Sequence, residues 1–157
     1  MKNKIRQWLL PAALAFVLLV TLTGCGKKEA ITAEAFQSAM EKQGYTVTDL
    51  TAQANSSGIS KILLAENGEK DINIRLTITE SDSIAKQLYK ADVDVYEAAD
   101  PQIKTTADVG NYNNFKASFN GEQVYVVEYR VDNTLISGAG DLSKKEQVDA
   151  IYSGFNY

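Results

Sequence analysis

Histidine is absent from this chain of 157 residues, and cysteine and tryptophan occur once each. Nucleophilic catalysis of the Ser-His or Cys-His kind requires an imidazole base, so the lack of histidine excludes that class of enzyme. Zinc sites recruit histidine or cysteine, and a single cysteine cannot form a disulfide within its own chain. We therefore expect no enzyme, no metal and no resident cofactor, with catalysis by a pair of carboxylates as the remaining enzymatic alternative.

Acidic side chains are absent from the first 24 residues. Residues 1–8, MKNKIRQW, contain three basic side chains, and residues 9–23, LLPAALAFVLLVTLT, contain no charge. A basic segment followed by a short apolar run is typical of a secretory signal peptide, and the run is shorter than the roughly 20 residues of a spanning helix. We expect residues 1–24 to be a signal peptide, with an uncleaved signal anchor as the alternative.

The lone cysteine stands at the end of this segment, where residues 22–25 read Leu22, Thr23, Gly24 and Cys25. These four residues resemble the bacterial lipobox. The resemblance implies cleavage before Cys25 and a diacylglycerol thioether on its sulfur, with or without an additional N-acyl group. Two acyl chains hold a protein stably on a bilayer. The expected location is therefore the extracytoplasmic face of the cell membrane, and the alternative is a chance Gly-Cys pair behind an ordinary cleavage site.

Beyond residue 24 the chain has 133 residues with 13 basic and 20 acidic side chains, a net charge of −7. This length suits one domain, and a negative charge does not favour nucleic acid or anionic lipid as a partner. We expect residues 25–31 to be the lipidated N-terminus with a short tether, and residues 32–157 to be a single extracytoplasmic domain.

Apolar periodicity predicts the elements of that domain. Residues 72–79 alternate strictly between apolar and polar side chains, as a strand with one buried face does. The expected helices are 33–43, 82–99 and a last one capped by Ser143 and Glu146, and the expected strands are 45–50, 59–66, 71–79, 114–119, 122–131 and 134–137. Residues 102–113 are expected to link them without regular structure. The order α-βββ-α-βββ-α predicts an α+β fold whose mainly antiparallel sheet carries all three helices on one face.

Two segments of this pattern are similar to each other. Residues 65–78 and 118–131 align without a gap at a spacing of 53 residues, and both contain Asn-Gly-Glu. The Asn-Gly pairs, 67–68 and 120–121, favour two-residue hairpin turns. A duplicated hairpin unit would explain the similarity, and so would two unrelated hairpins that use the same favourable turn.

Three groups of residues are candidates for a site. Asp92, Asp94, Glu97 and Asp100 form the densest acidic cluster, which we interpret as a solvated face of the helix at 82–99. The apolar stripe of that helix is expected at Ile84, Leu88, Ala91, Val95 and Ala98. Residues 137–141, SGAGD, are interpreted as a flexible turn, with a backbone N–H site for an anion before the last helix as the alternative. Tyr112, Tyr125 and Tyr129 are the candidate ligand-binding residues, as an aromatic platform for glycans or peptides, with ordinary strand packing as the alternative.

The segment ITAEAFQSAMEKQGYTVTDLT at residues 31–51 and the segment RVDNTLI at residues 130–136 resemble those of small lipobox-containing lipoproteins of Gram-positive, Firmicutes-type bacteria. The resemblance covers most of the chain after Cys25, and it implies no activity and no functional residue beyond the lipobox. We expect a lipid-anchored envelope lipoprotein whose domain binds or modulates an envelope protein or cell-wall component. The alternative is a small-ligand or glycan-binding module that uses the tyrosine-rich sheet face.

Overall fold

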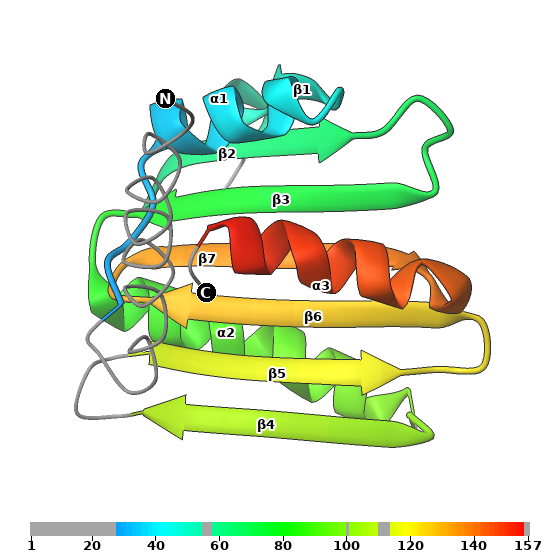
Figure 1. The fold of residues 1–157 in the computed structure, drawn as a ribbon. Helices are drawn as coiled ribbons and strands as arrows, with labels where there is room; N and C mark the ends of the chain where they lie inside the picture. Colours follow the sequence, from blue (N-terminus) through cyan, green and yellow to red (C-terminus); the bar gives the residue numbers. More distant parts are fainter. Residues whose placement is uncertain (1–27, 55–57, 100, 110–113, 156–157) are drawn as a thin grey trace, which may run out of the picture.

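The computed structural model describes residues 28–54, 58–99, 101–109 and 114–155. They form an α+β fold around a seven-stranded, entirely antiparallel sheet in the order β1-β2-β3-β7-β6-β5-β4 (Figure 1). The elements are α1 (Ala33–Lys42), β1 (Thr46–Asp49), the short η1 (Thr51–Gln53), β2 (Ile59–Glu66), β3 (Ile72–Thr79), α2 (Asp82–Ala98), β4 (Ile103–Val109), β5 (Asn114–Asn120), β6 (Val124–Val131), β7 (Thr134–Asp141), the short η3 (Leu142–Lys144) and α3 (Lys145–Gly154). The expected fold class is confirmed.

Local sequence signals set the ends of the first two helices. The Thr32 hydroxyl accepts a hydrogen bond from the backbone N–H of Ala35, and the Ser81 hydroxyl accepts one from Ile84 at the start of α2. Such side-chain caps satisfy backbone donors that have no partner within the helix. Beyond α1, Gly44 has φ +84°, a left-handed conformation that glycine adopts without strain. The third helix differs from expectation, because η3 precedes it and no side chain caps it.

The structure contains one strand more than expected and extends another. Strand β4 lies within the stretch expected to be an irregular link, and β7 continues through SGAGD, which therefore forms strand and not a flexible turn. Strand β4 occupies an edge of the sheet, where Ile103 to Thr106 are exposed on both faces. An exposed edge strand lacks the one-sided apolar alternation by which strands are recognised, which explains why this one was missed.

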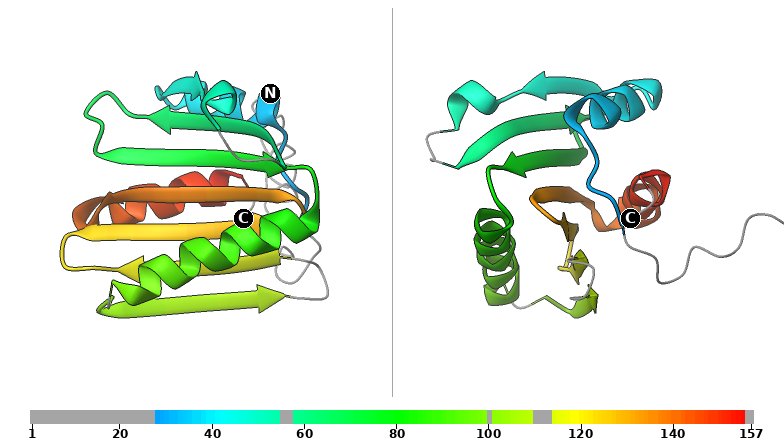
Figure 2. Two further views of the ribbon diagram at one scale, coloured as in Figure 1. Left: turned by 180° about the vertical axis from the view of Figure 1, so that it is seen from behind. Right: turned by 90° about the vertical axis from the view of Figure 1, so that its left-hand side faces the viewer.

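The helices cover both faces of the sheet, which corrects the prediction of a single covered face. Helix α1 packs on β1, β2 and β3, and α3 packs on β7. Helix α2 lies on the opposite face, across β3, β7, β6 and β5 (Figures 1 and 2). We name these the α3 face and the α2 face. Strand β6 is consequently buried on both sides, which explains its almost continuous apolar sequence VYVVEYRV.

The main hydrophobic core lies on the α3 face. Ile72, Ile74 and Leu76 of β3 are fully buried there, with Val148, Ile151 and Tyr152 of α3 above the sheet. Gly138 of β7 leaves room for the Tyr152 ring, because a Cβ at position 138 would lie 2.6 Å from the Tyr152 Oη. The largest described cluster of buried apolar residues extends from Phe36 to Tyr152. A chain beginning at Lys28 therefore retains every side chain of this core.

The turns also differ from expectation. The loop at Asn67-Gly68 is longer than two residues, because β2 ends at Glu66 and β3 begins at Ile72. The Asn67 Oδ1 accepts hydrogen bonds from the backbone N–H groups of Asp71 and Ile72. The loop after Asn120 is likewise longer than the expected pair. The two-residue turn of this sheet joins β6 to β7, where Asp132 has φ +51°.

The two similar hairpins differ in their orientation toward the helices. At the spacing of 53 residues Ile74 matches Val127, and the two lie in one cross-strand row on the α3 face. Helix α1 covers β3 on this face, whereas α2 covers β6 on the opposite face. The ungapped alignment therefore matches residues that lie differently relative to the helix preceding each hairpin.

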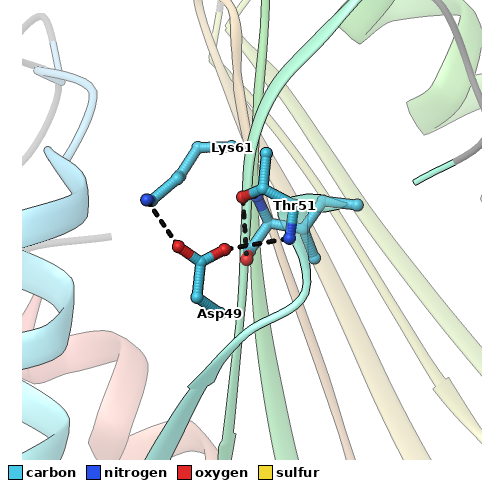
Figure 3. A network of polar contacts seen from close by, with 4 residues as sticks. Asp49, Thr51 and Lys61 are labelled. Carbon is cyan, nitrogen blue, oxygen red and sulfur yellow. Dashed lines mark hydrogen bonds and ion pairs between the residues drawn. The ribbon is translucent and has the colours of Figure 1, made fainter. Parts of the chain in front are cut away.

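A small polar network fastens β1 to β2 at the other edge of the sheet (Figure 3). The Asp49 carboxylate accepts hydrogen bonds from the Lys61 Nζ at 2.7 Å and from the Thr51 backbone N–H at 2.9 Å. The Thr51 hydroxyl in turn accepts from the backbone N–H of Ile62 at 3.0 Å. The ammonium of Lys61 and the Thr51 donors hold the pKa of Asp49 well below its usual range. Both oxygens of this exposed carboxylate are thus bonded.

Candidate ligand-binding site beneath helix α2

A row of polar side chains crosses the middle of the sheet on the α2 face. Arg75 in β3 lies opposite Ser137 in β7, and Ser137 lies opposite Glu128 in β6. Because side chains alternate along a strand, each of these residues points away from the apolar core of the α3 face. Asp92 of α2 contacts Arg75. We refer to Arg75, Asp92, Glu128 and Ser137 as the Arg75 cluster.

Arg75 uses only part of its hydrogen-bonding capacity. Its Nη2 atom lies 3.2 Å from the Asp92 Oδ2 and 3.2 Å from the Ser137 Oγ. Its Nε atom is buried and has no hydrogen-bond partner among the residues that the structure describes. A guanidinium carries five N–H donors in a planar fork, and 42% of the Arg75 side chain is accessible, so its accessible N–H groups can donate to a further acceptor.

Glu128 is fully buried, and neither of its carboxylate oxygens meets hydrogen-bond geometry with any described residue. Burial in a poorly solvated environment disfavours the charged form and raises the pKa of Glu128 to about 8. The Ser137 hydroxyl and the Arg75 charge oppose this shift, and the Asp92 charge adds to it. At neutral pH the Glu128 carboxyl is therefore mainly protonated and uncharged.

Burial also raises the pKa values of two residues of α2, Asp92 and Tyr96. Burial raises the pKa of Asp92, and the guanidinium of Arg75 offsets only part of this shift. Burial also raises the pKa of Tyr96 to about 12, with further contributions from the charges of Glu128 and Asp92. The Arg75–Asp92 pair is half-exposed, with 42% and 32% of the side chains accessible, so it is a weak ion pair.

Three cavities lie along the side of α2 that faces the sheet. The first, of about 140 Å³, lies between Arg75 and Asp92 and has apolar walls of Ile62, Leu88 and Leu135. The second, of about 170 Å³, lies between Arg75, Ser137, Tyr96 and Leu64. The third, of about 230 Å³, lies at the end of α2 between Tyr96, Phe119, Val124 and Val126. We name them the Leu88, Ser137 and Phe119 cavities.

The acidic cluster of α2 is divided between solvent and sheet. Asp94 pairs with Lys90 at 2.6 Å, and Glu97 pairs with Lys104, so both lie on the solvated face as expected. Asp92 instead faces the sheet and contacts Arg75, which corrects its interpretation as a surface residue. Asp100 lies outside the described residues.

The expected apolar stripe of α2 is displaced in its second half. Val95 is 66% exposed, whereas Ala85 is fully buried and Tyr96 is half-buried against Phe119, with ring centroids 5.5 Å apart. Asp92 occupies the sheet-facing position between them. A stripe defined by apolar residues alone omits the half-buried Asp92, which is why the predicted stripe differs from the sheet-facing side of α2.

The candidate tyrosine platform is covered by α3. Tyr125 and Tyr129 are 1% and 7% exposed. The Tyr125 hydroxyl donates to the Asp149 Oδ1 at 2.6 Å, and the Tyr129 ring stacks on Tyr152 at a centroid distance of 4.8 Å. The structure therefore favours packing for these two residues. Tyr112 and the lipobox residues Leu22, Thr23, Gly24 and Cys25 lie outside the described residues.

Sequence reasoning missed Arg75, Glu128 and Ser137 as members of one site. One signal was present, because Glu128 directly follows the apolar run VYVV at residues 124–127, and a strand so apolar is expected to be buried. A buried carboxyl requires a partner or a proton, so its position marks a polar centre. Nothing local indicated that β7 would place Ser137 between β3 and β6.

Within the described ranges, no group of three or more acidic, histidine or cysteine side chains is arranged to hold a metal ion. None of the helices in the same part of the chain combines the length and apolar character needed to cross a membrane.

The fold is similar to one solved structure of a bacterial protein. No family model matches the chain, and the search of curated proteins found no significant match. A crystal structure described as a GTP binding regulator from Thermotoga maritima matches 80% of this chain and 88% of that chain, with a TM-score of 0.50 and 16% sequence identity. At this identity the similarity concerns the fold alone.

Proposed function

We propose that this protein is a lipid-anchored envelope lipoprotein whose extracytoplasmic domain binds a small ligand between α2 and the sheet, without chemical conversion. The observation that carries the proposal is the partly used guanidinium of Arg75, which lines both the Leu88 and the Ser137 cavities. Binding sites are typically concave and largely apolar, with a few polar groups that orient the ligand. Arg75 is such a group, and the walls of Ile62, Leu64 and Leu88 supply the apolar surface.

The geometry favours binding over catalysis. Two acids, Asp92 and Glu128, lie in one cluster, which is the arrangement that carboxylate catalysis requires. However, a general acid must reach the proton of its substrate, and Glu128 is fully buried and lines none of the three cavities. The pair therefore supports a buried polar centre beneath the ligand and not an acid-base couple around it.

The location rests on the lipobox segment. Cys25→Ala removes the sulfur that would carry the diacylglycerol, so we expect loss of palmitate labelling and retention of the uncleaved signal peptide. Gly26→Ala is the matched control, because it changes the neighbouring residue and leaves the sulfur in place. Labelling of the Cys25→Ala protein would contradict the anchor. This outcome is independent of ligand binding.

The binding part of the proposal can be tested on residues 28–157, which retain the whole described core. A ligand-observed magnetic resonance screen would contain carboxylic acids, amines, wall-derived sugars and GTP, the last because of the description of the structural neighbour. At least one class should bind, and Arg75→Met should abolish that binding. Lys61→Met removes a basic partner of a different aspartate and should leave binding unchanged. A screen without any binder would refute the proposal.

A further inference from the structure

The three cavities beneath α2 form a row whose chemistry changes from one end to the other. The Leu88 and Ser137 cavities share Arg75, and the Ser137 and Phe119 cavities share Tyr96. Three members of the Arg75 cluster, Arg75, Asp92 and Ser137, line the first two cavities. The Phe119 cavity is the largest of these three and is lined almost entirely by apolar groups. A ligand that fills the row needs a polar head and an apolar tail.

The head must accept hydrogen bonds from Arg75. Arg75 lines both polar cavities with 42% of its side chain accessible, and Asp92 contacts it through one oxygen at 3.2 Å. A carboxylate matches two parallel N–H donors of an arginine in a planar, bidentate geometry. The half-exposed Asp92 contact contributes little and can yield to such an acceptor.

The charge of the cluster permits an anionic head. The charges of Arg75 and Asp92 balance each other, and the buried Glu128 carboxyl is mainly uncharged at neutral pH. At the surface, Lys90 and Lys104 balance the charges of Asp94 and Glu97. A cationic head would meet the guanidinium of Arg75 with no ionised acid on the wall beyond Asp92. The arrangement therefore favours a carboxylate over an amine.

The tail has a defined direction and length. Asp92 and Ala99 bound the polar and apolar ends of the row on α2, and seven helical residues span about 10 Å. Phe119, Val126 and Pro101 line the apolar end, and Val124 at its margin is 47% exposed. An apolar cavity of this kind can accept the apolar part of a ligand. The span corresponds to a medium-length alkyl chain.

We propose, as a refinement that rests on the proposed function, that the row of cavities binds a medium-chain carboxylic acid with its carboxylate on Arg75 and its alkyl chain extended past Tyr96 into the Phe119 cavity. Each methylene removed from water contributes about 0.8 kcal/mol, which corresponds to about fourfold in affinity. Affinity should therefore rise from hexanoate to octanoate to decanoate by about this factor per methylene.

Calorimetric titration of residues 28–157 with hexanoate, octanoate and decanoate below their micellar concentrations tests this series. Decylamine and decanol have the same tail with a different head, and both should bind at least tenfold more weakly than decanoate. Equal binding of decylamine would overturn the carboxylate assignment. Affinities that do not depend on chain length would overturn the placement of the alkyl chain in the Phe119 cavity.

Three variants test the head and the tail of the ligand separately. Arg75→Met should lower decanoate affinity more than tenfold, and Arg75→Lys, which keeps the charge without the fork, should lower it by a smaller factor. Ala99→Trp places a large ring at the exposed margin of the Phe119 cavity, so it should remove the gain from octanoate to decanoate and leave hexanoate unchanged. Unaltered decanoate affinity in both Arg75 variants would contradict the proposal.

A comparison with membranes identifies the source of the ligand. Vesicles of phosphatidylcholine and phosphatidylglycerol present acyl chains with phosphate heads, whereas decanoate is a free acid. Sedimentation with vesicles and no binding of decanoate would overturn the proposal in favour of membrane docking. If decanoate does not bind and another compound of the screen binds in an Arg75-dependent manner, the carboxylic-acid assignment is wrong and the proposed function is supported.

Discussion

The two faces of the sheet are stabilised in different ways. On the α3 face, the side chains of β3 and β6 are apolar and pack closely against α1 and α3. On the α2 face, the same two strands present Arg75 and Glu128, and cavities remain between the helix and the sheet. Close packing with few voids is the usual state of a protein interior. The difference indicates that the α3 face maintains the fold, whereas the α2 face retains polar groups and space at a cost in stability.

The polar groups themselves also differ between regions. In the edge network the Asp49 carboxylate has a partner for each oxygen, although it is exposed. In the Arg75 cluster the Glu128 carboxyl has none among the described residues, although it is buried. Proteins normally satisfy buried polar groups first, so this reversal points to function. Four paired experiments test the comparison.

The largest effect is expected from truncation on the two faces of neighbouring strands. Ile74→Ala removes a fully buried side chain from the α3 face, so the free energy of unfolding should fall by about 2–5 kcal/mol. Leu64→Ala removes a partly buried side chain that lines the Ser137 cavity, and the loss should be about 1 kcal/mol. Urea denaturation of both variants measures the difference. Equal losses would refute the contrast between the faces.

The second effect is a pH dependence of the free energy of unfolding, which originates from Glu128. Its folded-state pKa of about 8 exceeds the unfolded value of 4.5, so its stabilising contribution is complete below pH 4.5 and is lost as the pH rises through 8. The free energy of unfolding should fall by an amount on the order of a few kcal/mol across this window. Glu128→Gln should remove this dependence.

Denaturation midpoints from pH 5 to pH 9 measure this pH dependence of stability. Glu80→Gln, at an exposed position, is the control. Its denaturation midpoint should change with pH as that of the original protein does. A Glu128→Gln protein with the same slope as the original would show that another group causes the dependence.

The third comparison enlarges the side chain at neighbouring positions of β7, by one methyl group at Gly138 and by two at Ala139. A Cβ at Gly138 would lie 2.6 Å from the Tyr152 Oη and 3.0 Å from the Ile74 Cδ1, so Gly138→Ala should cost about 1–3 kcal/mol by overpacking. Ala139 lines the Ser137 cavity on the other face, so Ala139→Val should change the free energy of unfolding by less than about 0.5 kcal/mol. Thermal denaturation of both variants tests this, and a destabilised Ala139→Val protein would indicate that no usable space exists.

The smallest effects concern two aspartates whose pKa values shift in opposite directions. Lys61 and Thr51 lower the pKa of Asp49, so its contribution is present above the unfolded pKa and is lost as the pH falls. Burial raises the pKa of Asp92, so the sign is reversed. At pH 7, Asp49→Asn should slightly lower the denaturation midpoint, whereas Asp92→Asn should leave it unchanged or raise it. The same sign for both variants would contradict the assigned environments.

Much of the fold was predictable because the signals are local. The alternation in residues 72–79 predicted β3, and apolar periodicity predicted the helices at 33–43 and 82–99. The site was less predictable. Asp92 was assigned to the surface because an aspartate beside other acids on a helix is usually solvated. Strand β4 was missed because an edge strand has little apolar surface to bury.

The sequence by itself determined the α+β class, the main strands and helices, and the prediction of a lipid anchor at Cys25, since each depends on residues that are close together in the chain. Only the tertiary structure decided that α2 covers the opposite face and that Arg75, Ser137 and Glu128 share one row. The physical reason is that β7 pairs with β3 and β6 at once, so contacts over as many as 62 residues create the polar row. No local sequence pattern predicts such pairings, because the apolar periodicity of a strand is the same whichever strand it pairs with.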